Sequence, residues 1–473
     1  MNSRLLAFAY ASAIVLPGLL VLLGPRPMAG FLLYACGFIA LASLMMLCIQ
    51  FVTSGRFERL AAPFGLDVIM GFHRFAGRVV ILAIAAHVLL SVWLAAGGDL
   101  SEVPAVVAEF VTSERLATGF IGLILASVLV WSAVRRDRIT LRYEWWRLSH
   151  GIGALVLLIV ATHHAWTNAV FMRTASVTVP IVGGIVAAFA SFAVIYVIRA
   201  VKARNADWRV EGVVPLGAGL HEVTLLGASP PAFSFRAGQF AWVTFDRRHP
   251  LTDHPFSIAS APGELPKLRL IIKENGDFTN AIGSLPAGTP AYLDGPHGSF
   301  VANPKARSIV LIAGGVGVAP ILSILHSLAD DRFARPVAVL VATRNERDQI
   351  FMREVEELSG QLDMRTMLVV ERPSESWKGE RGRIDEPRLR RLISGVPVDG
   401  AEILMCGPLP MMEATSRLLL RLGLSTNQIR YERFDYHEGS DPKSQATRQR
   451  FVLLLGISTG LVLLTAAIGA YFS

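Results

Sequence analysis

The sequence predicts a multi-domain membrane protein: a six-helix transmembrane bundle, an antiparallel β-barrel, an α/β domain with a parallel sheet, and an extra C-terminal transmembrane helix. Three observations lead to this prediction. Six apolar segments of membrane-spanning length fill about the first 200 residues. From residue 206, short β-type runs and then alternating strands and helices replace them. A final uncharged apolar run occupies residues 451–472.

The composition of the 473-residue chain agrees with a membrane protein of two or three folding units. Charged residues make up 17% of it, whereas soluble domains carry about 25%. The net charge of +8 indicates basic cytoplasmic loops, and no basic cluster with interleaved aromatic residues points to nucleic acid. Cys36, Cys48 and Cys406 form no CxxC pair, which excludes zinc fingers, Cys₄ iron–sulfur sites and a disulfide framework.

The apolar segments of the predicted transmembrane domain, residues 1–203, are each close to the ~20 residues that cross a bilayer. They occupy residues 4–24, 29–52, 68–96, 116–134, 147–169 and 177–199. The first could pass for a signal peptide, but more segments of membrane length follow it. We therefore interpret it as a spanning helix.

Charge orients these helices in the membrane. Cationic residues follow the second, fourth and sixth segments: Arg56, Arg59, Arg135, Arg136, Arg138, Arg142, Arg199, Lys202, Arg204 and Arg209. The loop 98–115 instead carries Asp99, Glu102, Glu109 and Glu114. By the positive-inside rule, the N-terminus and everything after the sixth segment are cytoplasmic, in a multi-pass protein of the inner or plasma membrane.

The pattern past residue 206 is that of a soluble module. The runs HEVTLL, QFAWVTF and KLRLIIK, separated by Gly and Pro, predict a barrel over residues 206–302. Over residues 303–436, the strands SIVLIAGG, PVAVLVAT, RTMLVV and AEILMC alternate with helices such as APILSILHSL and one near 348–358. A polar linker, residues 437–450, precedes the run 451–472. Its unbroken apolar circumference favours a seventh spanning helix over a buried helix of a soluble domain.

Two apolar segments carry histidines at matching intervals. His73 and His87, and likewise His150 and His164, are fourteen residues apart. At about 100° per residue, this interval returns to nearly the same helix face about 21 Å further along. Because ionisable side chains in hydrocarbon are costly and usually functional, we interpret the four as two bis-histidine sites at two depths. Each site could hold a six-coordinate haem iron suited to electron transfer.

Other interpretations of these segments stay open. His163 competes with His164, although in a straight helix it points about 140° away unless a bulge corrects it. The histidines could also pack or hydrogen-bond between helices, which fits one lone histidine better than two matched intervals. Arg74, Arg78 and Arg147 could pair with haem propionates or extend to the lipid headgroups.

Two motifs of the predicted barrel suit a flavin. A flavin needs a flat apolar face against its ring and a hydrogen-bonding group near its reactive nitrogen, and Phe256 and Ser257 of HPFSIAS can supply them. In NGDFTNAI, Gly276 and Thr279 stand at a helix start, where free backbone N–H groups would receive a pyrophosphate. Alone, each motif also fits a strand and a turn of an ordinary β domain.

Two motifs of the α/β part suit a nucleotide. GGVGVAP, residues 314–320, ends a buried strand and opens a helix, and its glycines let the backbone approach a phosphate, although such turns also occur for packing. MCGP, with Cys406 and Gly407, closes a later strand at the edge where open α/β sheets bind ligands. Cys406 could be a structural thiol; beside the other motifs, we place it next to a nicotinamide ring.

Taken in order, HPFS, GDFT, GGVGVAP, CGP and YERF resemble the ferredoxin–NADP reductase superfamily. With the histidines and the stretch HRFAGRVVILAIAAH, the sequence is similar to the ferric reductase and NADPH oxidase family of transmembrane flavocytochromes b. The resemblance covers about residues 30–436. It implies two b-type haems in the bundle, FAD in the barrel and NADPH or NADH in the α/β domain.

The resemblance also implies roles for single residues. The flavin positions correspond to His254, Pro255, Phe256 and Ser257, and the oxidase branch has HPF where many soluble relatives have Arg and Tyr. Gly276 and Thr279 would hold FAD phosphates. Phe434 of YERF would stack on the flavin until nicotinamide displaces it. In relatives this aromatic residue lies near the chain end, whereas here about forty residues follow, as a tether or a partner-binding surface.

The resemblance also implies roles for the glycine-rich turn after the strand SIVLIAGG and for residues near it. Gly314, Gly315 and Gly317 would face the pyrophosphate, and Arg344 is a candidate for the 2′-phosphate of NADPH. Cys406 and Gly407 complete the site. The implied catalytic residues are Ser257, Cys406 and Phe434.

Together these features predict electron transfer from cytoplasmic NAD(P)H through FAD and two haems to an acceptor outside. We place dioxygen, which would give superoxide, ahead of a ferric chelate, a quinone or a periplasmic redox protein, because of the HPF variant and the bundle's similarity. The lipid bilayer is the expected surrounding, and the sequence does not identify a partner protein. A transporter or sensor regulated by a flavin domain would need gating charges or broken helices in the first 200 residues, and none is seen.

Overall fold

The computed structural model describes residues 3–22, 30–54, 57, 66–204, 207–228, 233–245, 252–346 and 351–432, and nine single positions between 449 and 467. The chain divides into two compact units. One comprises residues 1–57, 68–199 and 444–473, and the other comprises residues 58–67 and 200–443. Phe434, the linker 437–450 and most of the predicted helix 451–472 lie outside the described residues.

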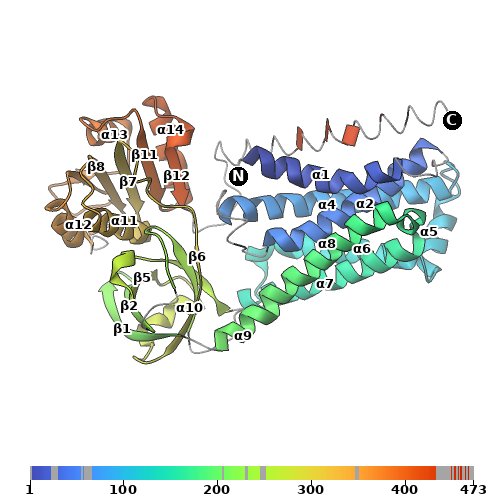
Figure 1. The fold of residues 1–473 in the computed structure, drawn as a ribbon, viewed down its shortest axis with the longest axis horizontal. Coiled ribbons are helices and arrows are strands. Elements are labelled where there is room, and N and C mark those ends of the chain that lie inside the picture. Colours follow the sequence, from blue (N-terminus) through green and yellow to red (C-terminus); the bar gives the residue numbers. More distant parts are fainter. Residues whose placement is uncertain are drawn as a thin grey trace. The chain divides into compact units, whose positions relative to one another are not determined.

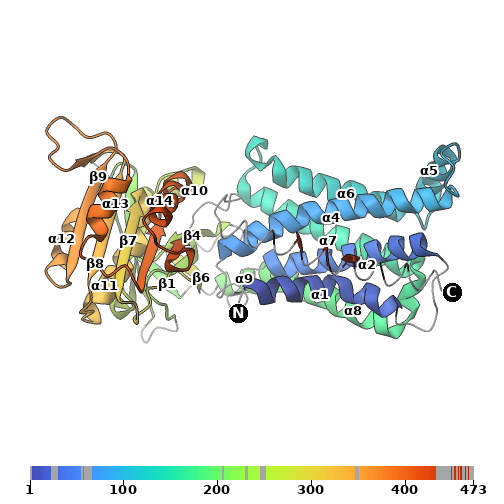
Figure 2. The same cartoon turned by 90° about the horizontal axis from the view of Figure 1, so that it is seen from above.

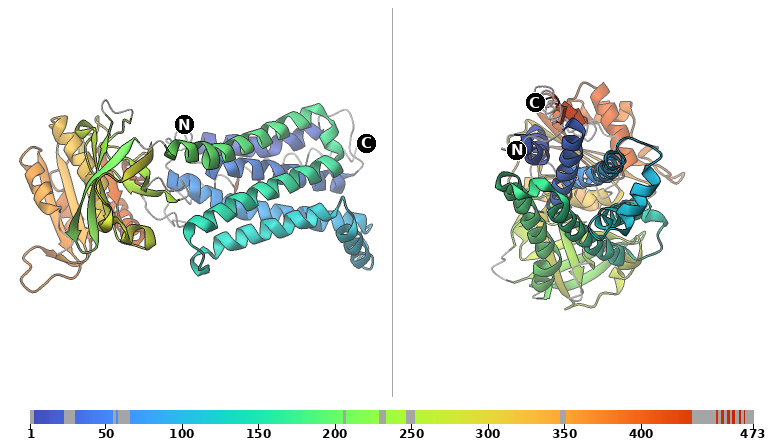
Figure 3. Two further views of the ribbon diagram at one scale, coloured as in Figure 1. Left: turned by 90° about the horizontal axis from the view of Figure 1, so that it is seen from below. Right: turned by 90° about the vertical axis from the view of Figure 1, so that its right-hand side faces the viewer.

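The first unit is a helical bundle. Its long helices are α1 (Ser3–Leu22), α2 (Phe31–Ser54), α4 (Leu66–Ala95), α6 (Ala117–Val134), α7 (Tyr143–Asn168) and α8 (Ala175–Ala193). They run side by side, as Figure 1, Figure 2 and Figure 3 show from different directions. Five of them, α2, α4, α6, α7 and α8 with its continuation, are long and apolar enough to cross a membrane. These five apolar helices agree with five of the predicted spans.

One helix of the bundle is mostly buried by its neighbours, whereas the other spans have large exposed faces. Helix α2 is apolar all round and mostly buried, because it packs against α1, α7 and α8. Leu41, Leu44 and Cys48 on it belong to the bundle core. The other spans expose large apolar side chains, such as Leu89 and Trp131, on their outer faces. In a bilayer these faces meet lipid.

Two features of the bundle differ from the sequence prediction. The acidic loop 98–115 contains a ten-residue helix, α5 (Val103–Thr112), with a proline in its first turn. It lies at one end of the bundle (Figure 2). Helix α7 begins at Tyr143 rather than 147, since Tyr143, Trp145 and Trp146 add an aromatic first turn. The short helices η2 (Val170–Arg173) and η3 (Val194–Ile198) also belong to this unit, whereas α9 (Arg199–Arg204) falls almost wholly in the second unit.

The second unit begins with an antiparallel sheet. Its strands are β1 (Trp208–Gly217), β2 (Leu220–Gly227), β3 (Phe240–Phe245), β4 (His254–Ser257), β5 (Lys267–Lys273) and β6 (Pro290–His297). They pair in the order β4-β3-β6-β1-β2-β5. An antiparallel bridge between Ile258 and Leu270 joins the two edge strands. The sheet therefore closes into the predicted barrel around an apolar core.

A parallel sheet follows. Its strands are β7 (Ser308–Gly314), β8 (Val337–Thr343), β9 (Met364–Val370), β10 (Glu380–Arg381), β11 (Ala401–Cys406) and β12 (Ile429–Glu432), in the order β10-β9-β8-β7-β11-β12. Alternate residues of β7 face two separate cores: Ile309 and Leu311 on one side, Val310 and Ile312 on the other. Helices cover both faces: α11 (Val318–Asp330) and α12 (Met352–Ser359), then α13 (Glu386–Ile393) and α14 (Leu409–Arg421).

Candidate functional site

His87 of α4 and His164 of α7 face each other inside the bundle. Their ring centres are 6.5 Å apart, and the ring planes meet at 76°. Both line one cavity of about 1010 Å³, bounded mostly by apolar side chains of α2, α4, α6 and α7. A metal ion between two imidazoles, with bonds of about 2 Å, would hold the ring centres about 6 Å apart. The pair and its cavity therefore fit a metal-centred planar group held by two histidines.

The protonation of His87 follows from its partner. Its Nδ1 lies 3.1 Å from the backbone oxygen of Cys36. A carbonyl oxygen only accepts, so Nδ1 carries the proton and Nε2 keeps a lone pair for a metal. The Cys36 thiol lies 3.4 Å from the same Nδ1 and 3.1 Å from Ser91 Oγ, and both side chains line the cavity.

His163 is placed differently from His164. Its side chain is exposed and does not line the cavity, whereas the Nδ1 of His164 lies 2.9 Å from Thr118 Oγ1. The straight helix α7 thus brings His164 and not His163 to His87. Thr118 was missed from the sequence because no spacing relates a residue of α6 to a histidine of α7.

The second histidine pair lies on the same two helices. His73 on α4 and His150 on α7 each stand fourteen residues before a member of the first pair. Each has a buried Nδ1 with no hydrogen-bond partner in the described part of the chain. Trp146 stacks on the His150 ring with centres 5.3 Å apart, and Gln50 donates to the His73 backbone oxygen over 2.9 Å. Buried imidazole nitrogens rarely lack a partner, so this pair also fits a bound group.

In the described ranges, no group of three or more His, Cys, Asp or Glu side chains is arranged to hold an ion.

The HPFS strand forms the candidate flavin surface. Strand β4 pairs with β3 at one edge of the barrel sheet. The Ser257 hydroxyl is buried and has no hydrogen-bond partner among the described residues. The Phe278 ring lies 4.0 Å from the His254 ring and 6.2 Å from that of Phe256. The sequence reasoning did not single out Phe278, although it stands inside the GDFT motif.

The GDFT turn is held in a fixed shape. Gly276 has φ +99°, a value that favours glycine, and it caps the short helix α10 (Asp277–Asn280). The Thr279 hydroxyl accepts from the backbone N–H of Asn275 over 2.6 Å. Just before the turn, His221 contacts Glu274 over 2.7 Å. These contacts fix the turn, and Gly276 itself is exposed.

The glycine turn (residues 314–317) and the CGP turn (residues 406–408) meet at the carboxyl ends of β7 and β11. These strands are parallel neighbours, with Ala313 opposite Cys406. A Cβ at Gly317 would lie 2.3 Å from the Cys406 backbone oxygen, so only glycine allows this approach. Gly314 and Gly407 also pack closely, whereas Gly315, with φ +54°, is exposed. The arrangement matches the switch point at which open α/β sheets bind nucleotides.

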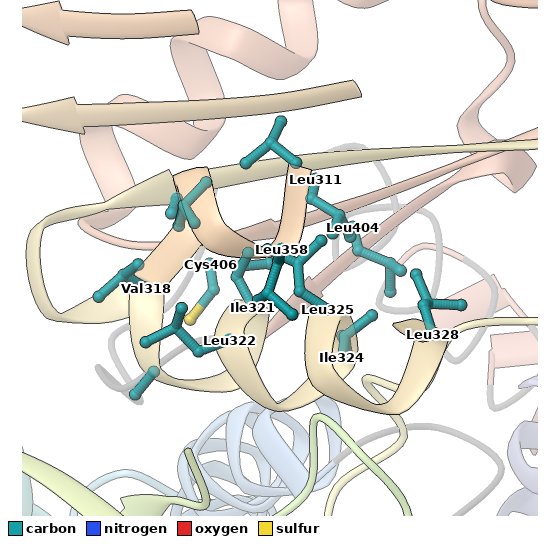
Figure 4. Close-up of a cluster of buried hydrophobic side chains, with 14 of the residues drawn as sticks. Leu311, Val318, Ile321, Leu322, Ile324, Leu325, Leu328, Leu358, Leu404 and Cys406 are labelled. Atoms are coloured by element: carbon teal, nitrogen blue, oxygen red, sulfur yellow. The ribbon is translucent and has the colours of Figure 1, made fainter. Parts of the chain in front are cut away.

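The Cys406 side chain points into the core rather than outward. It lies among Val318, Ile321 and Leu322 of α11, as Figure 4 shows, and is fully buried. Burial raises the pKa of the thiol well above its usual value, and the Glu432 carboxylate acts in the same direction. The part of Cys406 that borders the glycine turn is thus its backbone.

The predicted phosphate ligand Arg344 directly follows β8 and is exposed. Its backbone oxygen accepts from the N–H of Arg372 over 2.9 Å, so two arginines follow the ends of neighbouring strands β8 and β9. This edge is the same carboxyl edge that carries the glycine turn.

An ion network joins the barrel to the α/β part. Arg269 of β5 contacts Glu354 of α12 over 2.5 Å, and His326 of α11 donates to the same carboxylate over 2.6 Å. Burial alone would raise the pKa of Glu354, but the His326 hydrogen bond and the Arg269 charge outweigh it, so this pKa lies below its ordinary value. The network links the two sheets that carry the candidate flavin and nucleotide surfaces.

Comparison with known proteins gives matches to three families. Residues 36–161 match the ferric reductase like transmembrane component, residues 220–300 an FAD-binding domain, and residues 311–417 the oxidoreductase NAD-binding domain. The chain is 30% identical over 244 residues to ferredoxin–NADP reductase B of Sorangium cellulosum, which covers 50% of this chain and 100% of that protein.

Other relatives cover between 45% and 86% of the chain. The chain is 28% identical over 220 residues to the xylene/toluene monooxygenase electron transfer component of Pseudomonas putida, covering 45% of this chain and 62% of that protein. Among solved structures, the ferredoxin reductase in carbazole 1,9a-dioxygenase gives a TM-score of 0.43 at 25% identity, over 49% of this chain and 69% of that one. A flavohemoglobin from Malassezia yamatoensis gives 0.46 at 18% identity, over 86% of this chain and 98% of that one.

Proposed function

The chain belongs to the ferredoxin–NADP reductase family and carries a ferric reductase-like transmembrane component in its N-terminal half, and on this premise we propose that it moves electrons across the membrane from NAD(P)H to an acceptor on the other side. It is an NAD(P)H-dependent oxidoreductase of the membrane. The proposed route uses FAD and two b-type haems, and the proposed acceptor is dioxygen, which would give superoxide.

The observation that carries the haem proposal is the pairing of His87 with His164. Their rings stand 6.5 Å apart across one apolar cavity, and Nδ1 of His87 is bonded so that Nε2 is left for iron. His73 and His150 would hold the second haem near the other membrane surface. Bis-histidine ligation leaves no open position on iron, which suits electron transfer.

In the second unit, Phe256 would lie against the flavin ring and the Ser257 hydroxyl would face its reactive nitrogen. When bound, FAD supplies the conversion between the two-electron hydride of nicotinamide and one-electron carriers. Gly276 and Thr279 would hold its phosphates, and His254 and Pro255 would complete the edge of the site. Phe434 would cover the flavin until nicotinamide enters.

The nucleotide would bind at the carboxyl edge of the parallel sheet. Gly314, Gly315 and Gly317 would face the pyrophosphate, with Gly407 beside them. Cys406 would support the nicotinamide through its backbone, with its thiol held in the core. Arg344 would contact the 2′-phosphate of NADPH, which would make NADPH the preferred donor. The proposed domains are residues 1–203 for haem, 206–302 for FAD and 303–436 for NAD(P)H.

We propose six spanning helices in the bundle, α1 included, and a seventh over residues 451–472. Helix α6 supports the orientation, because one arginine, Arg115, precedes it next to Glu114, whereas Arg135, Arg136 and Arg138 follow it. By the positive-inside rule, the arginine end is cytoplasmic. The protein would then lie in the inner membrane, with its FAD and NAD(P)H domains in the cytoplasm.

A ferric chelate is the second candidate acceptor, and the match of residues 36–161 to a ferric reductase-like component favours it. Purified protein in liposomes distinguishes the two. With NADPH and air, we expect superoxide on the side opposite the nucleotide. Reduction of a ferric chelate under argon at a higher rate, with no superoxide in air, would replace dioxygen by iron as the acceptor.

A further inference from the structure

The first turn of α6 packs closely against the His164 ring. Thr118 Oγ1 lies 2.9 Å from Nδ1 of His164. A Cβ at Gly119 would lie 3.0 Å from Cε1 of the same ring and 3.4 Å from Nε2, which is tighter than ordinary packing. Thr118, Gly119 and His164 all line the cavity that also holds His87. Two consecutive residues thus border the imidazole: Thr118 hydrogen-bonds it, and Gly119 leaves room for the ring because it has no side chain.

The hydrogen bonds around Thr118 assign the proton on His164. The Thr118 hydroxyl donates to the Arg115 backbone oxygen over 2.8 Å. Its single proton is then committed, so Oγ1 accepts from the N–H at Nδ1 of His164. Nε2 of His164 keeps its lone pair, as Nε2 of His87 does.

Asn168 is the other polar neighbour of this nitrogen. Its Nδ2 lies 3.4 Å from Nδ1 of His164, but it makes shorter contacts of 3.0 Å to the His164 backbone oxygen and 3.0 Å to Thr167 Oγ1. The shorter contacts of the Asn168 amide go to those oxygens, so Thr118 Oγ1 at 2.9 Å is the nearest side-chain partner of Nδ1, with the Arg115 backbone oxygen as a further acceptor beside the ring.

We propose that Thr118 is a positioning residue for the electron-transfer site: through its hydroxyl it fixes the tautomer of His164, and with Gly119 it selects His164 rather than His163 as the haem ligand. The proposal rests on the proposed haem function. His163, the neighbour of His164 on α7, is exposed and does not line the cavity. A hydrogen bond to the far nitrogen of a ligating histidine raises its basicity and fixes its ring. Thr118 therefore stabilises the oxidised state of the haem that His164 holds.

The test is a redox titration, with electron paramagnetic resonance, of purified full-length protein. In Thr118→Val, we expect the midpoint potential of one of the two haems to shift to more positive values, with a changed resonance signal for that haem only. Thr118→Ser, which keeps the hydroxyl, should restore both. The control is Thr162→Val in α7, two residues before His164, since the buried Thr162 hydroxyl has no partner in the described part of the chain.

Gly119→Ala gives an independent arm, because the added methyl group presses on the ring. We expect it to lower the haem content per FAD toward half. Gly183→Ala in α8, where a Cβ meets nothing within 4 Å, should keep the full content. The FAD content reports whether each variant folds.

Two results would overturn the proposal. One is a Thr118→Val protein with both potentials unchanged, and the other is the same shift in Thr162→Val. Failure of the proposed function looks different. In that case the wild type lacks haem, or His164→Ala keeps both haems.

Discussion

The imidazole rings of His87 and His164 stand 6.5 Å apart, one from α4 and one from α7, across a shared cavity. This separation arises because the two helices run in the same direction and present their second histidines at the same depth. The first histidines, His73 and His150, lie one on each of the same helices, fourteen residues earlier. The equal intervals in the sequence therefore agree with a second pair at another depth.

The choice between the adjacent histidines of α7 gives the first prediction. His164→Ala should halve the haem content per FAD, because one of two ligand pairs loses a member. His163→Ala should keep the full content, since that side chain is exposed and away from the cavity. The pyridine haemochrome assay against bound flavin measures both. Equal loss in the two variants would contradict the assignment.

Ser257 carries a second prediction, because its buried hydroxyl has no partner among the described residues. Ser257→Ala should slow reduction of the flavin by NADPH about 10-fold or more, which corresponds to roughly 1.4 kcal/mol of lost hydrogen bonding. Stopped-flow absorbance at the flavin band measures this rate. Ser284→Ala is the control, since the exposed Ser284 hydroxyl donates only to the Ala281 backbone oxygen. An unchanged rate in Ser257→Ala would remove this residue from the flavin site.

Arg344 tests the nucleotide preference. Losing one charge-assisted contact to a phosphate should raise the KM for NADPH about 10-fold in Arg344→Ala. The KM for NADH should stay the same, because NADH lacks the 2′-phosphate. Lys305→Ala, an exposed cation just before β7 at the opposite edge of the sheet, is the matched control. Equal changes for both nucleotides would instead indicate a general effect on binding.

The network of Arg269, Glu354 and His326 predicts a pH dependence of stability. The pKa of Glu354 is lowered in the folded protein, so the carboxylate contributes stability above its ordinary pKa of 4.5. That contribution is lost as the pH falls through the lowered value. Glu354→Gln should therefore cost about 1–3 kcal/mol at pH 7.5 and less at pH 4.

Thermal release of FAD fluorescence from the full-length protein measures this difference. Glu357→Gln is the control, because the exposed Glu357 pairs only with Arg353 one turn away on the same helix. A Glu354→Gln difference that grows toward pH 4 would contradict the sign of the shift.

Hydropathy and strand periodicity predicted most elements of the fold. The run AEILMC became β11 with the same bounds, and KLRLIIK became β5. Helix α5 was missed because ten residues in an acidic loop are too short to show a clear period. Strands β1 and β6 were missed because each contains Gly and Pro, which usually interrupt strands.

Site residues could be predicted where the pattern that identifies them lies within one segment of the sequence. The fourteen-residue intervals need only helix geometry, and the glycine turn after β7 needs only local backbone rules. The contacts of Thr118 with His164, of Cys36 with His87 and of Arg269 with Glu354 join residues from separate elements. Such pairs depend on packing, which a single sequence does not encode by spacing. The orientation of the Cys406 thiol is a similar case, since strand alternation predicts two faces but not which of the two covered faces the thiol joins.

The most direct test of the central claim is an absorption spectrum of the purified protein before and after NADPH is added under argon. We expect a flavin band that bleaches and a haem Soret band that shifts to the reduced b-type form, with two haems per FAD. A flavin spectrum that bleaches without any haem band would contradict it. The histidine pairs would then be structural, and the protein would be a membrane-bound flavin reductase.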